Sequence, residues 1–415
     1  PRTPDMPDPA DTQPNPKPPP GRPRRIAYAH DWLVGYRGGE AVLERLAALP
    51  TRRPDLHLQA TPLYTMFHTP GAVASQAPAT DALQARVSWL NRFPTRSVAR
   101  RGRRWLLPMY PFAVGGLGRA LTRDHAREPI DLLLSTSSAA IKGLRPPADV
   151  PHLCYCHSPA RYLWDRTDQY GGDSIKAKAR SAGLGLFGPW LRSWDRRTAA
   201  HATRFVANSK HTAALIQRAY GRDATVIHPP ARTAYFTPAS RPKREDFWLV
   251  VAALEPYKRT DLAIDAALHA GARLVIAGEG GQRAELEARA ADAPAGQITF
   301  TGRVSDERLR ELYRTARLLV FPQVEDFGIV AVEAQAAGCP VVARAEGGAL
   351  DTVVDGVTGA LFTGSAPEAL AEAADRAPEH ADTACARHAQ AFGETAFDNA
   401  MAAQIEDLLT DAQKR

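Results

Sequence analysis

The chain has little cysteine and no long apolar run, and each absence excludes a class of protein. Only 4 of its 415 residues are cysteine, too few for the disulfide framework of a small secreted protein and without the paired spacing of a zinc site. No run of about 18 uncharged apolar residues is present to span a bilayer. These absences favour a protein of the reducing cytoplasm, either soluble or peripherally bound to a membrane.

Two of the cysteines, Cys154 and Cys156, lie two positions apart in HLCYCHS. In a strand, this spacing points both side chains to the same face. We therefore favour packing over metal ligation or redox chemistry for the pair.

Proline is dense in the first 23 residues, which also lack an apolar h-region. That composition predicts a disordered tail rather than a signal peptide. The rest of the chain is too long for one ordinary core, and its hydrophobic fraction of 44% and charged fraction of 23% are those of a globular protein. We expect two domains.

The net charge of +7 is unevenly distributed. From Arg24 to Pro230, 30 Lys and Arg face 14 Asp and Glu, whereas from Ala231 onward 19 face 28. The first half therefore carries +16 and the second −9. A basic first half suggests an anionic partner such as a phospholipid surface or a phosphorylated acceptor. Nucleic acid is not favoured, because no nucleic-acid-binding motif accompanies the charge.

Short apolar runs alternate with helical patterns along the chain, which predicts an α/β fold. The first half has expected strands at residues 25–30, 130–135, 152–156, 204–207 and 225–227, with a loop at 31–39 and a helix at 40–49. After a proline-punctuated linker at 226–238, expected strands follow at 247–254, 273–278, 298–302, 317–322 and 340–344. This alternation predicts two parallel sheets covered on both faces, with ligands at the carboxyl ends of the strands.

The stretch EDFGIVAVEAQAAGCP places Glu325 in a loop and Glu333 inside a helix that is expected to begin near Gly328. Glu333 is roughly 8 Å along the helix axis and thus too far in to cap the amides. The free amides of Phe327, Gly328 and Ile329 favour an anion. A nucleotide sugar has hydroxyls at both ends and a diphosphate between them, which fits this layout. On this stretch alone, an early-turn helix charge at Glu325 and an exposed surface residue at Glu333 are an equally good interpretation.

Several motifs together resolve that choice, because they resemble the retaining glycosyltransferases of the GT-B fold, family 4. The family's signature is two glutamates separated by seven residues, as Glu325 and Glu333 are. Within the family the chain is similar to bacterial mannosyltransferases that build O-antigen and exopolysaccharide repeat units. The resemblance runs from about residue 24 to the last helix and is carried by HDWLVGYRGGE, CYCHSPARYLWD, RFVANS, YGRDATVIHPP, PYKRTDLAI, GRVSDERLRELY, EDFGIVAVEAQAAGCPVVA and GGALDTVVDGVTG.

The resemblance implies a GT-B architecture, with two Rossmann-like domains whose parallel sheets face each other across a cleft. The expected segments are a disordered tail (1–23), an acceptor-binding domain (24–230), a nucleotide-sugar-binding domain (231–392) and a C-terminal helix (393–415) that packs back toward the first domain.

The resemblance also implies roles for the charged residues near the donor. Lys258 would neutralise the leaving diphosphate, Glu325 would accept hydrogen bonds from the sugar and Glu333 from the ribose. The family usually has an arginine five residues before this lysine, where the chain has Ala253. Arg259 is a substitute candidate.

His157, at the end of a first-half strand, would contact the donor sugar or its β-phosphate, and a core histidine is the alternative. Gly38 and Gly39 supply a tight loop whose amides can approach the phosphate or the acceptor, or they form a plain turn before a helix. Val304 takes the position whose backbone meets the base, with Ser305 capping the next helix.

Three further features leave alternatives open. Gly347 and Gly348 form either a second anion nest or a structural turn, and Gly278 with Gly280 is expected to be only a strand-end turn. The segments at residues 88–112 and 174–197 mix Lys and Arg with apolar residues, as in membrane-interface helices or in ordinary surface helices.

The functional hypothesis is transfer of mannose from GDP-mannose to a lipid-linked saccharide at the inner membrane face. No residue cluster has metal-ligand spacing, so we expect no metal or other cofactor. The resemblance implies retention of configuration with no covalent protein nucleophile. The alternatives are the same reaction with a UDP-sugar, and a non-catalytic nucleotide-sugar-binding assembly protein, which the alanine at position 253 favours.

Overall fold

The computed structural model describes residues 21–92, 103–164, 175–240 and 243–414. The expected proline-rich tail lies almost wholly outside these residues. The basic segment at 88–112 and the amphipathic one at 174–197 are described in part, without the side chains of residues 103–105 and 175–184.

The chain forms two compact units. The first unit comprises residues 1–155, 160–204 and 404–415, and the second comprises residues 156–159 and 205–403. The end of the last helix thus groups with the N-terminal part of the chain.

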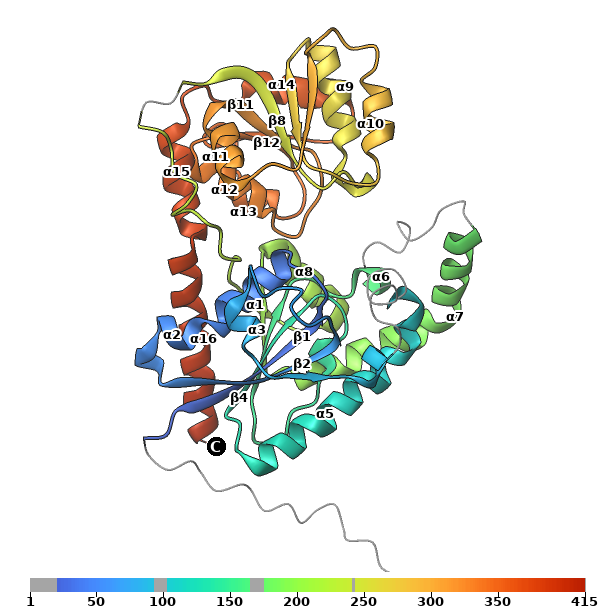
Figure 1. Cartoon of the computed structure of the whole chain (residues 1–415), viewed down its shortest axis with the longest axis vertical. Helices are drawn as coiled ribbons and strands as arrows, with labels where there is room; N and C mark the ends of the chain where they lie inside the picture. Colours follow the sequence, from blue (N-terminus) through green and yellow to red (C-terminus); the bar gives the residue numbers. More distant parts are fainter. Residues whose placement is uncertain (1–20, 93–102, 165–174, 241–242, 415) are drawn as a thin grey trace, which may run out of the picture. The chain divides into compact units, whose positions relative to one another are not determined.

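The first sheet has seven strands, in the order β3-β2-β1-β4-β5-β6-β7. The pairs β1–β2, β1–β4, β2–β3 and β6–β7 are parallel. The strands are β1 (Arg24–Leu33), β2 (Leu58–His68), β3 (Ala85–Val87), β4 (Leu132–Ser137), β5 (His152–Cys156), β6 (Arg204–Ala207) and β7 (Ala224–Val226). Figure 1 shows β1, β2 and β4 side by side, in agreement with their pairing.

The second sheet has six strands, in the order β10-β9-β8-β11-β12-β13, and its neighbouring strands pair in parallel. Its strands are β8 (Glu245–Val251), β9 (Leu274–Ala277), β10 (Ile298–Gly302), β11 (Ala316–Phe321), β12 (Val341–Arg344) and β13 (Gly359–Phe362). Both sheets have the doubly wound order in which the first strand lies in the middle, so the carboxyl ends of the central strands form the expected ligand edge.

Helices connect the strands. In the first half they are α1 (Gly38–Ala47), α2 (Leu49–Arg52), α3 (Pro78–Asp81), α5 (Tyr110–Arg127), α6 (Arg161–Trp164), α7 (Ile175–Thr198) and α8 (Lys210–Tyr220). In the second half they are α9 (Thr260–Ala270), α10 (Arg283–Arg289), α11 (Asp306–Thr315), α12 (Ile329–Ala336), α13 (Ala349–Thr352), α14 (Pro367–Arg376), α15 (Asp382–Ala389) and α16 (Glu394–Lys414). Short 3-10 turns include η4 (Arg103–Met109), η5 (Ile141–Gly143) and η8 (Pro256–Lys258).

Alternate residues of the second sheet pack into two separate apolar cores, because successive strand side chains point to opposite faces. Leu249, Leu319 and Val341 pack with α12 on one face. Val250, Leu318 and Val342 pack with α9 and α14 on the other. Burial of both faces explains why these strands read as continuous apolar runs in the sequence.

The four cysteines, Cys154, Cys156, Cys339 and Cys385, are buried free thiols. Burial raises the pKa of the Cys154 thiol to about 12. This environment agrees with packing and keeps the thiol protonated, which disfavours nucleophilic or ligand chemistry.

The fold class is confirmed as two doubly wound Rossmann-like sheets, and the sequence misjudged three details. β1 continues to Leu33 instead of entering a loop at Asp31, because Trp32 and Leu33 extend its pairing with β2. β2 was not predicted, since Pro62 interrupts its pattern and its apolar residues gather in its second half. β3 and β13 were also missed, being only 3 and 4 residues long.

A buried ion pair fixes α7 in the first unit. The Lys142 Nζ donates to Asp195 Oδ1 at 2.6 Å, and both side chains are 1% exposed. The second carboxylate oxygen accepts from Trp164 Nε1 at 2.7 Å. The indole bond and the ammonium thus satisfy both carboxylate oxygens, as burial of a charge requires.

We predict that Lys142→Met lowers the free energy of unfolding by about 3–5 kcal/mol, because it leaves the Asp195 carboxylate buried without its counter-charge. The double variant Lys142→Met/Asp195→Asn retains an oxygen for Trp164 and should recover much of the loss. Urea denaturation of the three proteins measures this. Equal stability of the unmodified protein and Lys142→Met would contradict the assignment.

Candidate active site

The start of α12 is built around a glycine that no other residue replaces easily. Gly328 is its N-cap, with φ +90°, and a Cβ there would lie 2.7 Å from the Phe321 ring. The left-handed backbone and the close ring both select glycine. The helix runs over Ile329–Ala336, which confirms the expected helix and places the amides of Phe327, Gly328 and Ile329 at its positive end.

Two further glycines, Gly347 and Gly348, pack against the loop that precedes α12. The Gly348 amide donates to the Glu325 carbonyl at 2.8 Å. A Cβ on Gly347 would lie 2.4 Å from that carbonyl oxygen, and one on Gly348 would lie 2.3 Å from Phe327 Cα. Of the two alternatives for this pair, the structure therefore supports the structural turn, because the Gly348 amide is already used within the protein.

Lys258 and Glu325 lie in different loops of the sequence and meet in the structure. Lys258 ends η8, which follows β8, and its ammonium pairs directly with the Glu325 carboxylate. Gln323, a buried residue of the loop that contains Glu325, donates to Glu325 Oε1 at 3.3 Å, the oxygen that also pairs with Lys258. The side chains of Lys258 and Glu325 are 16% and 24% exposed, so both remain accessible to a ligand at the carboxyl edge of the second sheet.

Arg259 has a different setting from Lys258. It caps α9 with a left-handed backbone, φ +52°. Its guanidinium contacts Asp261 at 3.3 Å and the Ser365 hydroxyl at 3.5 Å. Arg344, at the end of β12, reaches the same hydroxyl at 3.3 Å. Arg344 was not predicted, because a single arginine after an apolar strand is an ordinary surface pattern.

Glu333 is buried, so its interpretation as an exposed surface residue is wrong. Its Oε1 accepts from Arg232 Nε at 3.1 Å. Burial raises the pKa of the Glu333 carboxyl and outweighs the opposing effect of the Arg232 guanidinium. Arg232 also pairs with Asp306 and lies over the Phe236 ring at 4.8 Å. The sequence did not reveal this arginine, because it lies in the linker, 101 residues from Glu333.

Val304 and the glycines after β9 shape the loops beside this edge. Val304 follows β10 and packs against the core on the α12 face, and Ser305 caps α11 by accepting from the Arg308 amide at 3.3 Å. A Cβ on Gly278 would lie 1.8 Å from the Ala252 carbonyl oxygen, and one on Gly280 would lie 2.3 Å from that of Leu254. The glycine turn thus lets the loops after β8 and β9 pack together by their backbones.

The residues predicted in the first half lie in the segments that follow β1 and β5. His157 follows β5, and its carbonyl accepts from Asn208 Nδ2 at 3.0 Å. Gly38 and Gly39 open α1 directly after the extended residue Arg37, as a turn before a helix requires. The donor contacts of His157, Gly39 and Val304 remain predictions.

Asp31 is an organising residue that the sequence did not reveal. Its buried carboxylate accepts the backbone amides of Ser138, Ala139, Ala140 and Ile141 at 2.7–2.9 Å. The carboxylate ties the end of β1 to the turn after β4. An amide-rich turn that would otherwise attract an anion is therefore filled by the protein's own charge.

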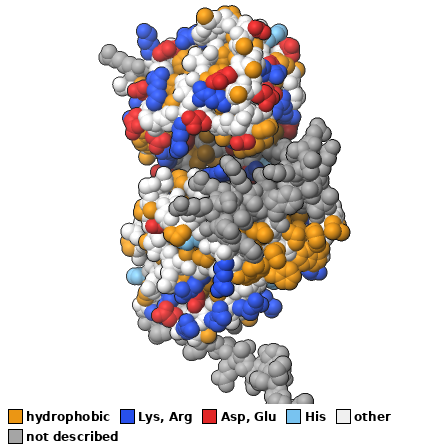
Figure 2. Space-filling view, turned by 45° about the vertical axis from the view of Figure 1, so that its right-hand side comes forward, with side chains coloured by type: hydrophobic (Ala, Val, Ile, Leu, Met, Phe, Trp, Pro, Cys, Tyr) orange, Lys and Arg blue, Asp and Glu red, His pale blue; other side chains and the backbone are white. Residues whose placement is uncertain are grey.

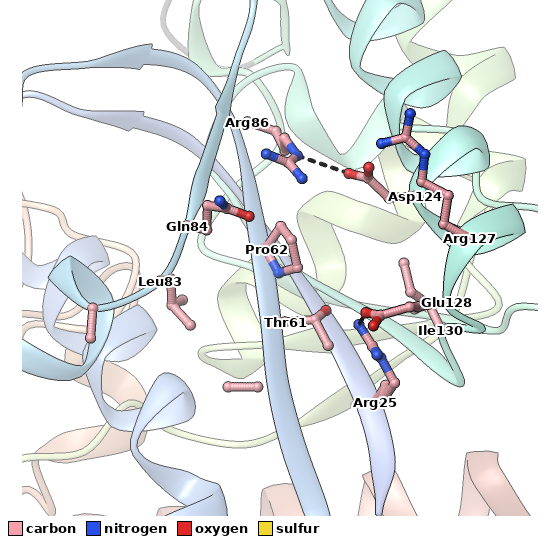
Figure 3. Close-up of a pocket in the computed structure, with 12 residues that line it drawn as sticks. Arg25, Thr61, Pro62, Leu83, Gln84, Arg86, Asp124, Arg127, Glu128 and Ile130 are labelled. Atoms are coloured by element: carbon pink, nitrogen blue, oxygen red, sulfur yellow. Dashed lines mark hydrogen bonds and ion pairs between the residues drawn. The ribbon is translucent and has the colours of Figure 1, made fainter.

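A cavity of about 530 Å³ lies at the edge of the first sheet formed by the amino ends of its strands. Its lining includes Arg25, Thr61, Gln84 and Arg86, from the amino ends of β1, β2 and β3. Figure 3 shows Arg86 directed at Asp124, with which it pairs at 2.9 Å. Because ligands of open parallel sheets bind at carboxyl ends, this cavity is not the candidate active site.

Within the described residues, no three His, Cys, Asp or Glu side chains are grouped to hold a metal ion. No helix in the described part of the chain is long and apolar enough to cross a membrane.

Two family models match the chain. Residues 232–398 match the glycosyl transferases group 1, and residues 72–235 match the Glycosyltransferase Family 4. Lys258, Glu325 and Glu333 all fall within the first of these matches.

Curated relatives carry the name D-inositol 3-phosphate glycosyltransferase. The protein from Mycolicibacterium smegmatis is 31% identical over 266 residues, which are 58% of this chain and 61% of the relative. The protein from Streptomyces griseus is 44% identical over 125 residues, 28% of this chain and 26% of the relative. The chain spans about three fifths or less of the length of these relatives.

Solved structures share the fold. Anabaena Alr3699/HepE in complex with UDP covers 92% of this chain and all of its own, with a TM-score of 0.67 and 18% identity. Sucrose-phosphate synthase from Thermosynechococcus elongatus covers 94% of this chain and all of its own, also with a TM-score of 0.67 and 18% identity. The chain therefore shares the fold of these structures, and this is the GT-B fold that the motifs led us to expect.

The raised pKa of Glu333 predicts a pH-dependent stability. The folded protein holds this proton more tightly than the unfolded chain, so stability falls as pH rises from the ordinary value of 4.5 through the folded-state pKa. Glu333→Gln should therefore stabilise the protein near neutral pH, with a smaller gain at acidic pH.

Thermal unfolding across this pH range measures the effect. Glu372→Gln, at an exposed position of α14, is the matched control and should leave the pH dependence unchanged. A gain for Glu333→Gln that is equal at acidic and neutral pH would contradict the assignment.

Proposed function

We propose that the protein is a retaining glycosyltransferase that moves a hexose from a nucleoside-diphosphate sugar to an acceptor. One observation carries the proposal: Lys258 and Glu325, from separate loops, meet at the carboxyl edge of the second sheet beside the amide end of α12. A cation, free amides and a carboxylate together suit a diphosphate joined to a polyhydroxylated sugar. The matches to two glycosyltransferase families support the same conclusion.

In this proposal, donor binding replaces the Lys258–Glu325 pair with new partners. The ammonium turns to the diphosphate, whose charge grows as the bond to the anomeric carbon breaks. The amides of Phe327, Gly328 and Ile329 hold the same group. The Glu325 carboxylate, released from its cation, accepts hydrogen bonds from the sugar hydroxyls.

The remaining predicted residues complete the donor contacts. Glu333 accepts from the ribose, Val304 meets the base through its backbone, and His157 with Gly39 approaches the sugar and its phosphate. Arg259 stands in for the arginine replaced at Ala253. The acceptor oxygen attacks on the face from which the diphosphate leaves, and its proton passes to the departing phosphate oxygen, so configuration is retained. No metal is required in this scheme.

Two donors are candidates. GDP-mannose follows from the similarity of the motifs to bacterial mannosyltransferases, and a UDP-sugar is supported by the complexes of HepE with UDP and with UDP-glucose. For the acceptor we propose a lipid-linked saccharide of cell-surface polysaccharide synthesis, reached by a cytoplasmic protein bound peripherally to the inner face of the plasma membrane. The names of the curated relatives add a phosphorylated cyclitol as a second acceptor.

A donor screen tests the proposal. Purified protein is incubated with GDP-mannose, UDP-glucose and related donors, each with and without a lipid-linked saccharide or inositol phosphate, and nucleoside diphosphate release is measured. Release with one donor class, enhanced by an acceptor, supports the proposal. Saturable donor binding without release on any acceptor would contradict it and favour a nucleotide-sugar-binding assembly protein.

With the preferred donor, we predict that Glu325→Ala lowers turnover by about 10²-fold or more while the melting temperature changes little. The side chain lies in a loop and positions the sugar through contacts that matter most in the transition state. Glu346→Ala, a glutamate of the same edge that pairs with Arg344 instead, is the matched control and should retain activity. Unchanged turnover of Glu325→Ala at saturating donor would remove Glu325 from the site.

A further inference from the structure

Large apolar side chains lie exposed on one part of the first unit. Leu186 is 75% exposed and Phe112 is 63% exposed, which is unusual for side chains that favour burial. Apart from Tyr36, the exposed large apolar side chains described in this unit are Trp89, Met109, Phe112, Leu186, Phe187 and Trp190. Figure 2 shows a broad area of hydrophobic side chains on the surface of the protein. A contiguous patch of this kind marks an interaction site in a water-soluble fold.

Contacts join these side chains into one surface, which we call the α5–α7 face. Phe112 of α5 and Trp190 of α7 have ring centroids 6.3 Å apart. The Trp89 ring lies beside the next turn of α5, 4.0 Å from the position of a Cβ on Gly116. The face is therefore continuous across both helices, although its residues come from separate parts of the sequence.

The exposed aromatic side chains cannot turn inward, because the opposite side of α7 is already packed. Leu191, next to Trp190, is buried with Ala160 and Leu163. One turn further along, Asp195 is held by the buried Lys142. The helix is thus fixed in a rotation that presents Leu186, Phe187 and Trp190 to solvent.

Arginine side chains accompany the α5–α7 face. The Arg119 guanidinium lies 4.0 Å from the position of a Cβ on Gly116, as the Trp89 ring does. The Arg192 guanidinium lies 3.6 Å from the position of a Cβ on Gly188. Arg123 is exposed one turn beyond Arg119. Among the described side chains of α5 and α7 that border this face, the charged ones are arginines.

The acidic residues of the same two helices do not offset that charge. Asp124 of α5 accepts from Arg86 Nε at 2.9 Å and from the Tyr64 hydroxyl at 2.8 Å. Asp195 of α7 is buried beside Lys142. Both carboxylates are therefore already neutralised by partners within the unit.

We propose that the α5–α7 face docks on a bilayer that contains anionic lipid. Phe112, Leu186, Phe187 and Trp190 enter the boundary between headgroups and acyl chains, where amphipathic and aromatic side chains are favoured. Arg119 and Arg192 contact lipid phosphates. Exposed apolar side chains flanked by cations that no carboxylate of α5 or α7 neutralises match this chemistry better than they match a protein surface of mixed charge. The inference rests on the proposed function, since a lipid-linked acceptor lies in such a bilayer.

Vesicle co-sedimentation of the full chain tests the apolar part of the docking surface. Phe187→Ser/Trp190→Ser should weaken binding to vesicles of phosphatidylcholine and phosphatidylglycerol by about tenfold or more. Val354→Ser/Val357→Ser is the matched control, because it changes two apolar residues of the second unit that are 41% and 49% exposed. The control should bind like the unmodified protein. Equal binding by all three proteins would overturn the proposal.

The charged part is tested with Arg119→Gln/Arg123→Gln on the same vesicles and on phosphatidylcholine alone. Binding should require phosphatidylglycerol, weaken as salt rises and fall in this variant. Arg218→Gln/Arg387→Gln, at exposed positions of α8 and α15, should leave binding unchanged. Equal binding of the unmodified protein to neutral and anionic vesicles would contradict the anionic-lipid assignment.

Two further readouts separate docking from catalysis and from protein association. Donor hydrolysis without vesicles should be the same for Phe187→Ser/Trp190→Ser and the unmodified protein. If neither protein hydrolyses a donor, the proposed function is contradicted. Vesicle binding would still test the docking surface independently. A dimer of the unmodified protein that becomes monomeric in this variant, with unchanged vesicle binding, would overturn the proposal in favour of an interface between two copies.

Discussion

The candidate site depends on close packing at three glycines, against a phenylalanine ring at Gly328 and against backbone atoms at Gly347 and Gly348. Gly328, Gly347 and Gly348 lie so close to Phe321, Glu325 and Phe327 that a single added carbon atom at any of them would approach within 2.7 Å. This packing holds the loop after β11 against the loop after β12. The loop after β11 ends at the N-terminus of α12. Its position therefore fixes both where the helix amides point and where Glu325 lies. Lys258 then has a defined carboxylate to meet.

The two glutamates predicted for the candidate site have opposite physical settings. Glu325 is accessible and is paired with a lysine that a ligand can compete for, whereas Glu333 is buried, is held by Arg232 and has a raised pKa. Keeping Glu333 in a buried setting costs stability near neutral pH. Carboxylates with a perturbed pKa occur both in binding sites and in structural ion-pair networks.

The sequence predicted what local patterns encode. The apolar strands, the glycine before α12 and the position of both glutamates follow from short-range periodicity and turn chemistry, and the structure agrees with them. The sequence did not reveal the Lys258–Glu325 pair, whose members are 67 residues apart, or the Arg232–Glu333 pair, whose members are 101 residues apart. Pairings of that kind depend on which loops the sheet order brings together. β2 was missed for a related reason: its pairing with β1 overrides the local effect of Pro62.

A crystal structure with a bound nucleoside diphosphate tests the central claim most directly. The account predicts diphosphate density against the amides of Phe327, Gly328 and Ile329, with Lys258 turned from Glu325 toward the phosphates. Density at the cavity lined by Arg25 and Arg86, at the opposite edge of the first sheet, with the Lys258–Glu325 pair intact, would contradict it.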